Sequence, residues 1–207
     1  MLTTFMIVDD FLNNAATLRE QALSLTYPEQ QGPFPGRNSL QRINLDGLDE
    51  AVSSLVGERL IPISPAQSHA KCRLTLANDK GKAKVHIDQS HWSGILYLSR
   101  NEDSSGGTDF FRHLRTDTDR APVFSDELAA KGYLSFGEMH ADIIEKDSVD
   151  DSKWELWSRV PMRFNRLVLL RPWLWHTAGP GFGDGPENGR LVYLMFFQSA
   201  ERAVIHG

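Results

Sequence analysis

Six short runs of β-branched, aliphatic and aromatic residues, separated by turn residues, dominate the chain from Ala70 onward. Runs of this length and spacing are typical of an all-β sandwich or small barrel. They read KCRLTLAN, AKVHID, SGILYLS, TDFFRH, NRLVLLR and GRLVYLMFFQ. A short strand and two stretches with helical spacing come before them. The first helix would begin near Asn13 or Asn14 and the second would end near Gly57 or Pro62. We therefore expect a mainly β fold led by two helices.

The chain has the size of one domain, because 207 residues that are 41% hydrophobic can bury one sizeable core. We expect a single domain over residues 1–207, with a helical lead-in over about 1–69 and a β core over about 70–200. A charged insertion over about 112–160 interrupts the strands, and it is too short and too polar to bury a core of its own. Long segments of this kind are often functional, so it is a candidate lid.

Charge and cysteine content narrow the function classes. The net charge of −5 disfavours general binding to nucleic acids or membrane surfaces. The single cysteine, Cys72, excludes an internal disulfide and a thiolate metal cluster. The first residues lack the basic start of a signal peptide, and no apolar run approaches the ~18 residues of a membrane span. We expect a cytoplasmic protein without nucleic-acid or membrane partners, and the sequence leaves its oligomeric state open.

A histidine and an aspartate two positions apart, His86 and Asp88, lie at the edge of a strand-like run. Residues i and i+2 of a strand face the same side, so both side chains would project together. A second histidine would complete the facial triad of two histidines and one carboxylate that binds Fe(II). His176 is the leading third ligand, because it closes an apolar run and precedes a Gly/Pro turn. His140 and Asp142 form a rival pair, but they lie in the polar insertion without a strong strand around them.

Arg190 opens the last strand-like run and, with a period of two, shares a face with Val192, Leu194 and Phe196. An arginine on an apolar face is costly unless a carboxylate meets it. Two interpretations stay open. Arg190 is either a strand-end residue whose charged end extends to water, or an anchor for a dicarboxylate cosubstrate.

The order of these motifs resembles that of the Fe(II)/2-oxoglutarate-dependent dioxygenases, in the branch that is similar to prolyl 4-hydroxylase. The resemblance runs from about Lys71 to Gln198 and rests on HID, ILYLS, GGTDFF, RLVLLRPWLWHTAGPG and GRLVYLMFF, in the family's order. It implies a double-stranded β-helix, which is a cupin-like jelly roll, with helices packed against its outside. It also implies that the protein uses Fe(II), 2-oxoglutarate as cosubstrate, and O2.

Carried over to this sequence, the resemblance implies that His86, Asp88 and His176 hold the iron and form the catalytic centre. Arg190 would pair with the distal carboxylate of 2-oxoglutarate. Tyr97 matches a position that hydrogen-bonds the cosubstrate, and a core aromatic residue is an equal interpretation.

The loop TAGPGFGDGPEN places Arg190 farther from His176 than is usual in this branch, so Lys84 and Arg171 remain alternative anchors. The carboxylate of Asp88 implies hydroxylation rather than halogenation, because related halogenases have a small residue at that position.

We expect hydroxylation of an unactivated C–H bond in a small molecule or an amino-acid side chain, with peptides included. Trp173 and Trp175 either pack in the core or line a substrate pocket. The acidic residues of the insertion either face water or favour a cationic substrate. Two other function classes stay open: a cupin-like metal dioxygenase that does not use 2-oxoglutarate, and a non-catalytic jelly-roll binding module.

Overall fold

The computed structural model describes residues 3–30, 32–64 and 68–203, and its strands form two antiparallel sheets. Among these residues the sheets stay separate rather than joining into one closed barrel. The expectation of a mainly β fold is confirmed. Within the described ranges, no helix is long and apolar enough to cross a lipid bilayer.

The larger sheet has seven strands, in the order β1-β8-β5-β10-β4-β2 with β3 paired to β10. These strands are β1 (Phe5–Val8), β2 (Arg37–Asn38), β3 (Leu60–Pro62), β4 (Cys72–Thr75), β5 (Trp92–Tyr97), β8 (Leu167–Leu170) and β10 (Arg190–Ser199). The smaller sheet has the order β7-β6-β9, with β6 (Gly107–His113), β7 (Trp154–Pro161) and β9 (His176–Thr177).

Two helices precede the strand-rich part, as the sequence predicts: α1 (Ala15–Leu23) and α2 (Leu48–Val56). Asn14 is the N-cap of α1, although its side chain makes no capping hydrogen bond. Gly57 ends α2 with a φ of 71°, a left-handed conformation that glycine adopts without steric cost. The buried residues Leu18 and Val52 join both helices to the main hydrophobic core.

The alternation along β10 divides the apolar residues between two clusters, as a strand buried on both faces requires. Leu191, Tyr193, Met195 and Phe197 belong to the cluster that includes α1 and α2. Val192 belongs to a second cluster, and Leu194 packs against it. That cluster also contains Phe110 and Val160 of the smaller sheet, so it lies between the two sheets.

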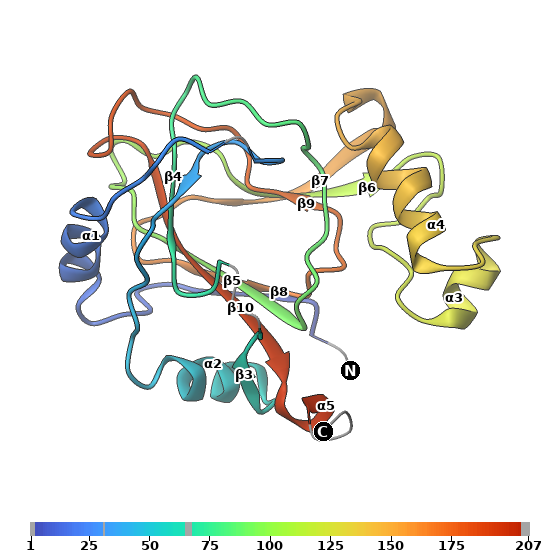
Figure 1. Ribbon diagram of the computed structural model, residues 1–207, viewed down its shortest axis with the longest axis horizontal. Coiled ribbons are helices and arrows are strands. Elements are labelled where there is room, and N and C mark those ends of the chain that lie inside the picture. The colour runs from blue at the N-terminus through green and yellow to red at the C-terminus, as the bar shows by residue number, and fades with distance from the viewer. Residues whose placement is uncertain (1–2, 31, 65–67, 204–207) are drawn as a thin grey trace.

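The insertion is shorter than the sequence suggested, because 112–113 and 154–160 belong to paired strands β6 and β7. The remaining 114–153 contain α3 (Ser125–Ala130), α4 (Phe136–His140), a π-turn over Ala141–Glu145 and a 3-10 turn over Asp151–Lys153. Figure 1 shows α3 and α4 beyond the ends of β6 and β7, on the side of the molecule away from α1.

The apolar residues of the insertion do not form an isolated core. Leu128, Met139 and Ile143 pack in one cluster with Phe111 and Trp175 of the body. This cluster could not be predicted from the sequence, because polar residues outnumber the apolar ones along the segment. The domain limits and the role of the insertion as a lid remain predictions.

Candidate metal centre

The structure brings His86, Asp88 and His176 together, with ligand atoms that all lie within 4.8 Å of one another. The His86 segment is not a regular strand. Instead, the His86 N–H donates to the His176 carbonyl at 2.9 Å, and the His176 N–H donates to the His86 carbonyl at 3.1 Å. The Asp88 N–H donates to the carbonyl of Pro172 at 3.1 Å. These backbone bonds join two segments that are far apart in the sequence.

Backbone carbonyls orient both imidazole rings in the same way. Nδ1 of His86 lies 2.9 Å from the Lys84 carbonyl, and Nδ1 of His176 lies 2.8 Å from the Leu174 carbonyl. A carbonyl only accepts, so Nδ1 carries the proton in each ring and Nε2 is left as a potential metal ligand. The two Nε2 atoms lie 3.9 Å and 3.6 Å from the carboxylate oxygens of Asp88.

The Asp88 carboxylate is itself held by a serine. The Ser93 hydroxyl, on β5, donates to Asp88 Oδ2 at 2.7 Å, and Ser90 Oγ lies 2.8 Å from Ser93 Oγ. Ser93 could not be predicted as part of the site, because a serine in an apolar strand gives no signal in the sequence without its long-range partner. This contact fixes the orientation of the carboxylate that faces the two imidazoles.

The protonation states suit cation binding. Burial and the nearby His176 lower the pKa of His86 to about 4, so this imidazole is neutral at neutral pH. Burial alone would raise the pKa of Asp88, but its contacts with His176 and His86 and the hydrogen bond from the Ser93 hydroxyl outweigh burial and hold the pKa at about 2. A neutral imidazole and an ionised carboxylate are the forms that ligate metals.

The triad opens into a cavity of about 1140 Å³ between the sheets and the loops that flank them. Its wall contains Trp154, Leu156 and Arg159 of β7, and residues of the loop after β9. Trp173 and Trp175 are not part of the lining, so core packing is the correct interpretation for them. The tryptophan in the lining is Trp154, the first residue of β7.

Arg190 is 1% exposed, and its Nε and Nη2 atoms have no hydrogen-bond partner among the described residues. It lies opposite Thr75, which lines the cavity, and Tyr97 and Asp109 lie near it. Burial lowers the pKa of its guanidinium. Because arginine stays protonated in proteins, a buried positive charge with two unused donors lies beside Thr75 of the cavity wall, although Arg190 itself is not one of the lining residues.

The Tyr97 hydroxyl is engaged on the larger sheet's inner face. It lies 2.7 Å from Thr108 Oγ1 and 3.3 Å from the carbonyl of Val160. Tyr97 is fully buried. These contacts join the two sheets, and the second one is long for an O–H donor.

The two alternative anchors already have partners. Arg171 pairs with Glu58 and stacks on Trp92, with 4.2 Å from its guanidinium carbon to the ring centroid. Lys84 forms an ion pair with Asp151 at the cavity mouth. Neither therefore is a buried cation with unpartnered nitrogen atoms among the described residues, as Arg190 is.

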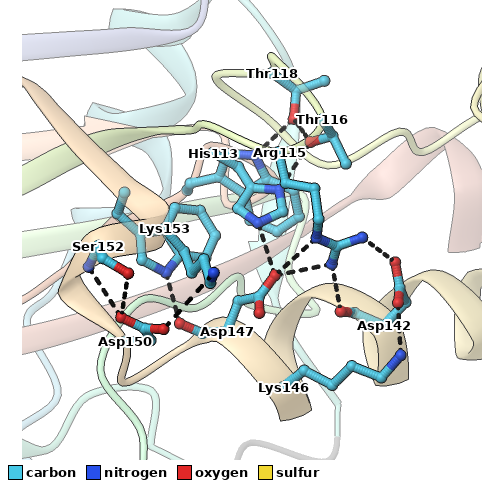
Figure 2. A network of polar contacts seen from close by, with 12 residues as sticks. His113, Arg115, Thr116, Thr118, Asp142, Lys146, Asp147, Asp150, Ser152 and Lys153 are labelled. Carbon is cyan, nitrogen blue, oxygen red and sulfur yellow. Dashed lines mark hydrogen bonds and ion pairs between the residues drawn. The ribbon is translucent and has the colours of Figure 1, made fainter.

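Asp142 of the rival pair lies in a different polar network, which Figure 2 shows. Asp142 accepts from Arg115 at 2.8 Å and from Lys146 at 2.7 Å, and His140 lies 3.5 Å from Glu145. These contacts hold the helical turns of the insertion together. His140 and Asp142 thus do not join the triad.

The same network is connected to the segment before His86 through Asp147 and the next residue, Ser148. Asp147 accepts from Arg115 and lies 3.0 Å from Nε2 of the buried His113 (Figure 2). The next residue, Ser148, accepts from the Lys84 N–H at 3.0 Å and donates to the Val85 carbonyl at 2.8 Å. The insertion therefore holds the segment whose carbonyl orients His86.

A family of unknown function, DUF6445, matches residues 2–197. The chain belongs to this family. No curated protein matches the sequence of this DUF6445 chain. Its fold is similar to that of HygX from Streptomyces hygroscopicus with nickel, 2-oxoglutarate and hygromycin B bound, with a TM-score of 0.58 and 14% identity over 96% of this chain and 84% of HygX. HygX with nickel and 2-oxoglutarate bound gives a TM-score of 0.51 at 15% identity, over the same shares of the two chains.

The Fe(II)/α-ketoglutarate-dependent dioxygenase TqaL also aligns, at 13% identity and a TM-score of 0.47 over 95% of this chain and 83% of TqaL. The resemblance that the sequence predicts for this DUF6445 protein extends to its fold, which it shares with HygX, a protein whose structures hold nickel and 2-oxoglutarate. At such low identity the likeness concerns the fold. The nickel and the 2-oxoglutarate bound in HygX accord with the His-Asp-His triad present here.

Proposed function

We propose that the protein is a non-haem Fe(II)- and 2-oxoglutarate-dependent dioxygenase that hydroxylates an unactivated C–H bond. The substrate is a small molecule or an amino-acid side chain. In this proposal the two sheets are the halves of a double-stranded β-helix, and the cavity between them is the active site. The support comes from the triad, from the unused donors of Arg190 and from the fold shared with HygX.

His86, Asp88 and His176 would hold the iron as a facial triad. The donor set fits Fe(II), since two neutral imidazole nitrogens and one carboxylate suit this borderline ion and leave coordination sites open. Fe(II) with 2-oxoglutarate supplies the activation of O2 that hydroxylation requires. The protein would position the cosubstrate and the substrate carbon and would shelter the site from water.

Arg190 is the observation that carries the proposal, because a triad alone does not select 2-oxoglutarate. Its Nε and Nη2 are buried and unpartnered, and leaving such a charge unmet costs free energy. The distal carboxylate of a dicarboxylate would satisfy both donors in one planar fork. A cupin-like dioxygenase without 2-oxoglutarate, or a binding module without metal, gives this arginine no partner.

Tyr97 has a smaller part in the proposal. To donate to the cosubstrate, its hydroxyl would exchange the 3.3 Å contact with Val160 for the carboxylate. The bond with Thr108 could stay in place. We therefore assign Tyr97 to the cofactor site as a residue that supports the carboxylate beside Arg190.

Anaerobic addition of Fe(II) and 2-oxoglutarate tests the proposal. We expect the weak visible absorption band of an iron-bound 2-oxo acid in the unmodified protein and its loss in His86→Ala and in His176→Ala. His140→Ala is the matched control and should retain the band. Absence of the band from the unmodified protein, or its persistence in both triad variants, would remove the basis of the assignment.

A further inference from the structure

A β-bulge changes which side chains of β7 face the cavity. The ladder of β6 and β7 pairs Phe110 with Ser158 and Phe111 with Leu156, so Trp157 is an extra residue on β7. In a regular strand, residues 156 and 159 would face opposite sides. With the bulge, Trp154, Leu156 and Arg159 all line the cavity.

Arg159 is held rigidly by its neighbour on β6. Asp109 accepts from Arg159 Nε at 2.5 Å and from Nη2 at 2.7 Å. The Asp109 side chain is 6% exposed and the Arg159 side chain is 45% exposed. One edge of the guanidinium is thus fixed on a buried carboxylate, while the Nη1–Nη2 edge keeps donors that make no other hydrogen bond to the described residues.

This arginine lies close to the proposed metal. Arg159 pairs with Asp109, and Asp109 pairs with Thr177, which follows the ligand His176. Strands are about 4.8 Å apart, so the backbone of Arg159 lies roughly 10 Å from that of Thr177. A small substrate could contact Arg159 at one end and present a carbon to the metal at the other.

We propose that Arg159 binds a carboxylate of the substrate, and that the apolar body of the substrate lies against Trp154, Leu156 and Phe111. This inference rests on the proposed function and names its substrate class: an organic acid with an aromatic or aliphatic part. Asp109 acts as a positioning residue, because it holds the guanidinium plane without contacting the substrate.

The contacts favour an acid over a cation. Both oxygens of Asp109 are used by Arg159, and Asp151, another acid of the lining, pairs with Lys84. A cationic substrate would have to share a carboxylate that already has a cationic partner. A carboxylate can bind without displacing any contact. Asp109 holds the guanidinium of Arg159 in place, and the N–H donors on the Nη1–Nη2 edge make no other hydrogen bond to the described residues.

The carboxylate at Arg159 is that of the substrate rather than that of 2-oxoglutarate. Arg190 is buried and has two unpartnered nitrogen atoms, whereas Arg159 already shares its charge with Asp109. The cosubstrate carboxylate therefore gains more at Arg190. Substitution of Arg190 should therefore weaken 2-oxoglutarate binding, whereas substitution of Arg159 should weaken binding of the substrate acid.

The test compares 3-phenylpropanoate with 3-phenylpropanamide, which have the same body and differ in charge. Binding to the full protein is measured by saturation-transfer NMR without metal, and again with Mn(II) and 2-oxoglutarate, where line broadening reports proximity to the metal. The variants are Arg159→Met, Arg159→Lys and the control Arg112→Met. Arg112 is an exposed arginine of β6 that pairs with Asp117 outside the cavity lining.

We expect the unmodified protein and Arg112→Met to bind the acid about tenfold more tightly than the amide, as one charge-assisted contact provides. Arg159→Met should abolish this preference and Arg159→Lys should retain part of it, while 2-oxoglutarate affinity stays unchanged in both. Equal binding of acid and amide to the unmodified protein, or no binding of either at millimolar concentration, would overturn the inference. The inference would also be overturned if Arg159→Met still binds the acid more tightly than the amide. A loss of 2-oxoglutarate affinity in Arg159→Met, instead of a loss of this preference, would overturn it too. Failure of Mn(II) or 2-oxoglutarate to bind the unmodified protein would instead count against the proposed function.

Discussion

Replacing Arg190 with methionine should stabilise the protein without ligand and weaken 2-oxoglutarate binding. The two effects have one cause. Arg190 is 1% exposed, and two of its nitrogen atoms lack a partner in the described residues. Methionine fills a similar volume with its flexible chain and buries no unsatisfied donor.

The structure sets the size of both effects. A buried unsatisfied polar group costs about 1–3 kcal/mol, so Arg190→Met should raise the free energy of unfolding of the ligand-free protein by about that amount. For a chain of this size, each kcal/mol corresponds to a Tm shift of about 2–4 °C. Truncating one partner of a buried charge pair costs about 2–5 kcal/mol, which predicts a loss of roughly thirtyfold or more in 2-oxoglutarate affinity.

Thermal unfolding measures both effects in one assay. With 2-oxoglutarate at a hundred times its dissociation constant, the metal-loaded unmodified protein should gain about 2.7 kcal/mol. At the same concentration, a variant with thirtyfold weaker affinity should gain about 0.9 kcal/mol. Arg171→Met is the matched control. It loses the ion pair with Glu58 and the stacking on Trp92, so it should lose stability and keep the full response to 2-oxoglutarate.

The reasoning fails if Arg190→Met is less stable than the unmodified protein and binds 2-oxoglutarate within about threefold of it. That outcome would mean that the guanidinium has a structural partner in solution. The cupin-like alternative would then gain weight, because the remaining residues of the site do not select a 2-oxo acid.

Three further predictions concern other parts of the structure. Ser93→Ala should weaken Ni(II) or Mn(II) binding by about 10–100-fold, measured by calorimetry, because the carboxylate of the triad loses its hydrogen bond; unchanged affinity would contradict this. Gly107→Ala should destabilise the fold far more than Gly137→Ala in denaturant unfolding, because a Cβ at 107 would lie 1.9 Å from a β7 carbonyl whereas at 137 it meets only a side-chain oxygen at 3.9 Å. The free energy of unfolding should fall as the pH decreases from 7 to 5. Burial lowers the pKa of His113 in the folded state, so in this range the unfolded chain, where the pKa is near 6.5, binds the proton more readily than the folded protein does. His113→Gln should reduce this dependence of stability on pH, and an unchanged dependence would contradict the assignment.

The strand-rich body could be predicted from local patterns alone. Period-two alternation assigned the two faces of β10, and the apolar runs located β1, β4, β5, β6, β8 and β10. β7 was missed, because its charged residues hide the alternation and its bulge breaks the period. Strands β2, β3 and β9 were missed as well. They are two or three residues long, and they are strands because they pair with neighbouring strands rather than because their residues have high β-propensity.

The sequence by itself determined which residue types are present for a metal site: two histidines, one aspartate and an arginine on an apolar face. Residue types are read directly from the chain, and the period of two holds for Arg190 on β10, but His86 and Asp88 do not lie on the regular strand that the sequence predicted. Only the tertiary structure decided that His86 and His176 meet, since their reciprocal backbone bonds join segments ninety positions apart. It also decided that Ser93 orients Asp88, that the insertion supports His86 and that Arg159 faces the cavity. These features depend on long-range hydrogen bonds and on one extra residue in a ladder, and neither leaves a local pattern in the chain.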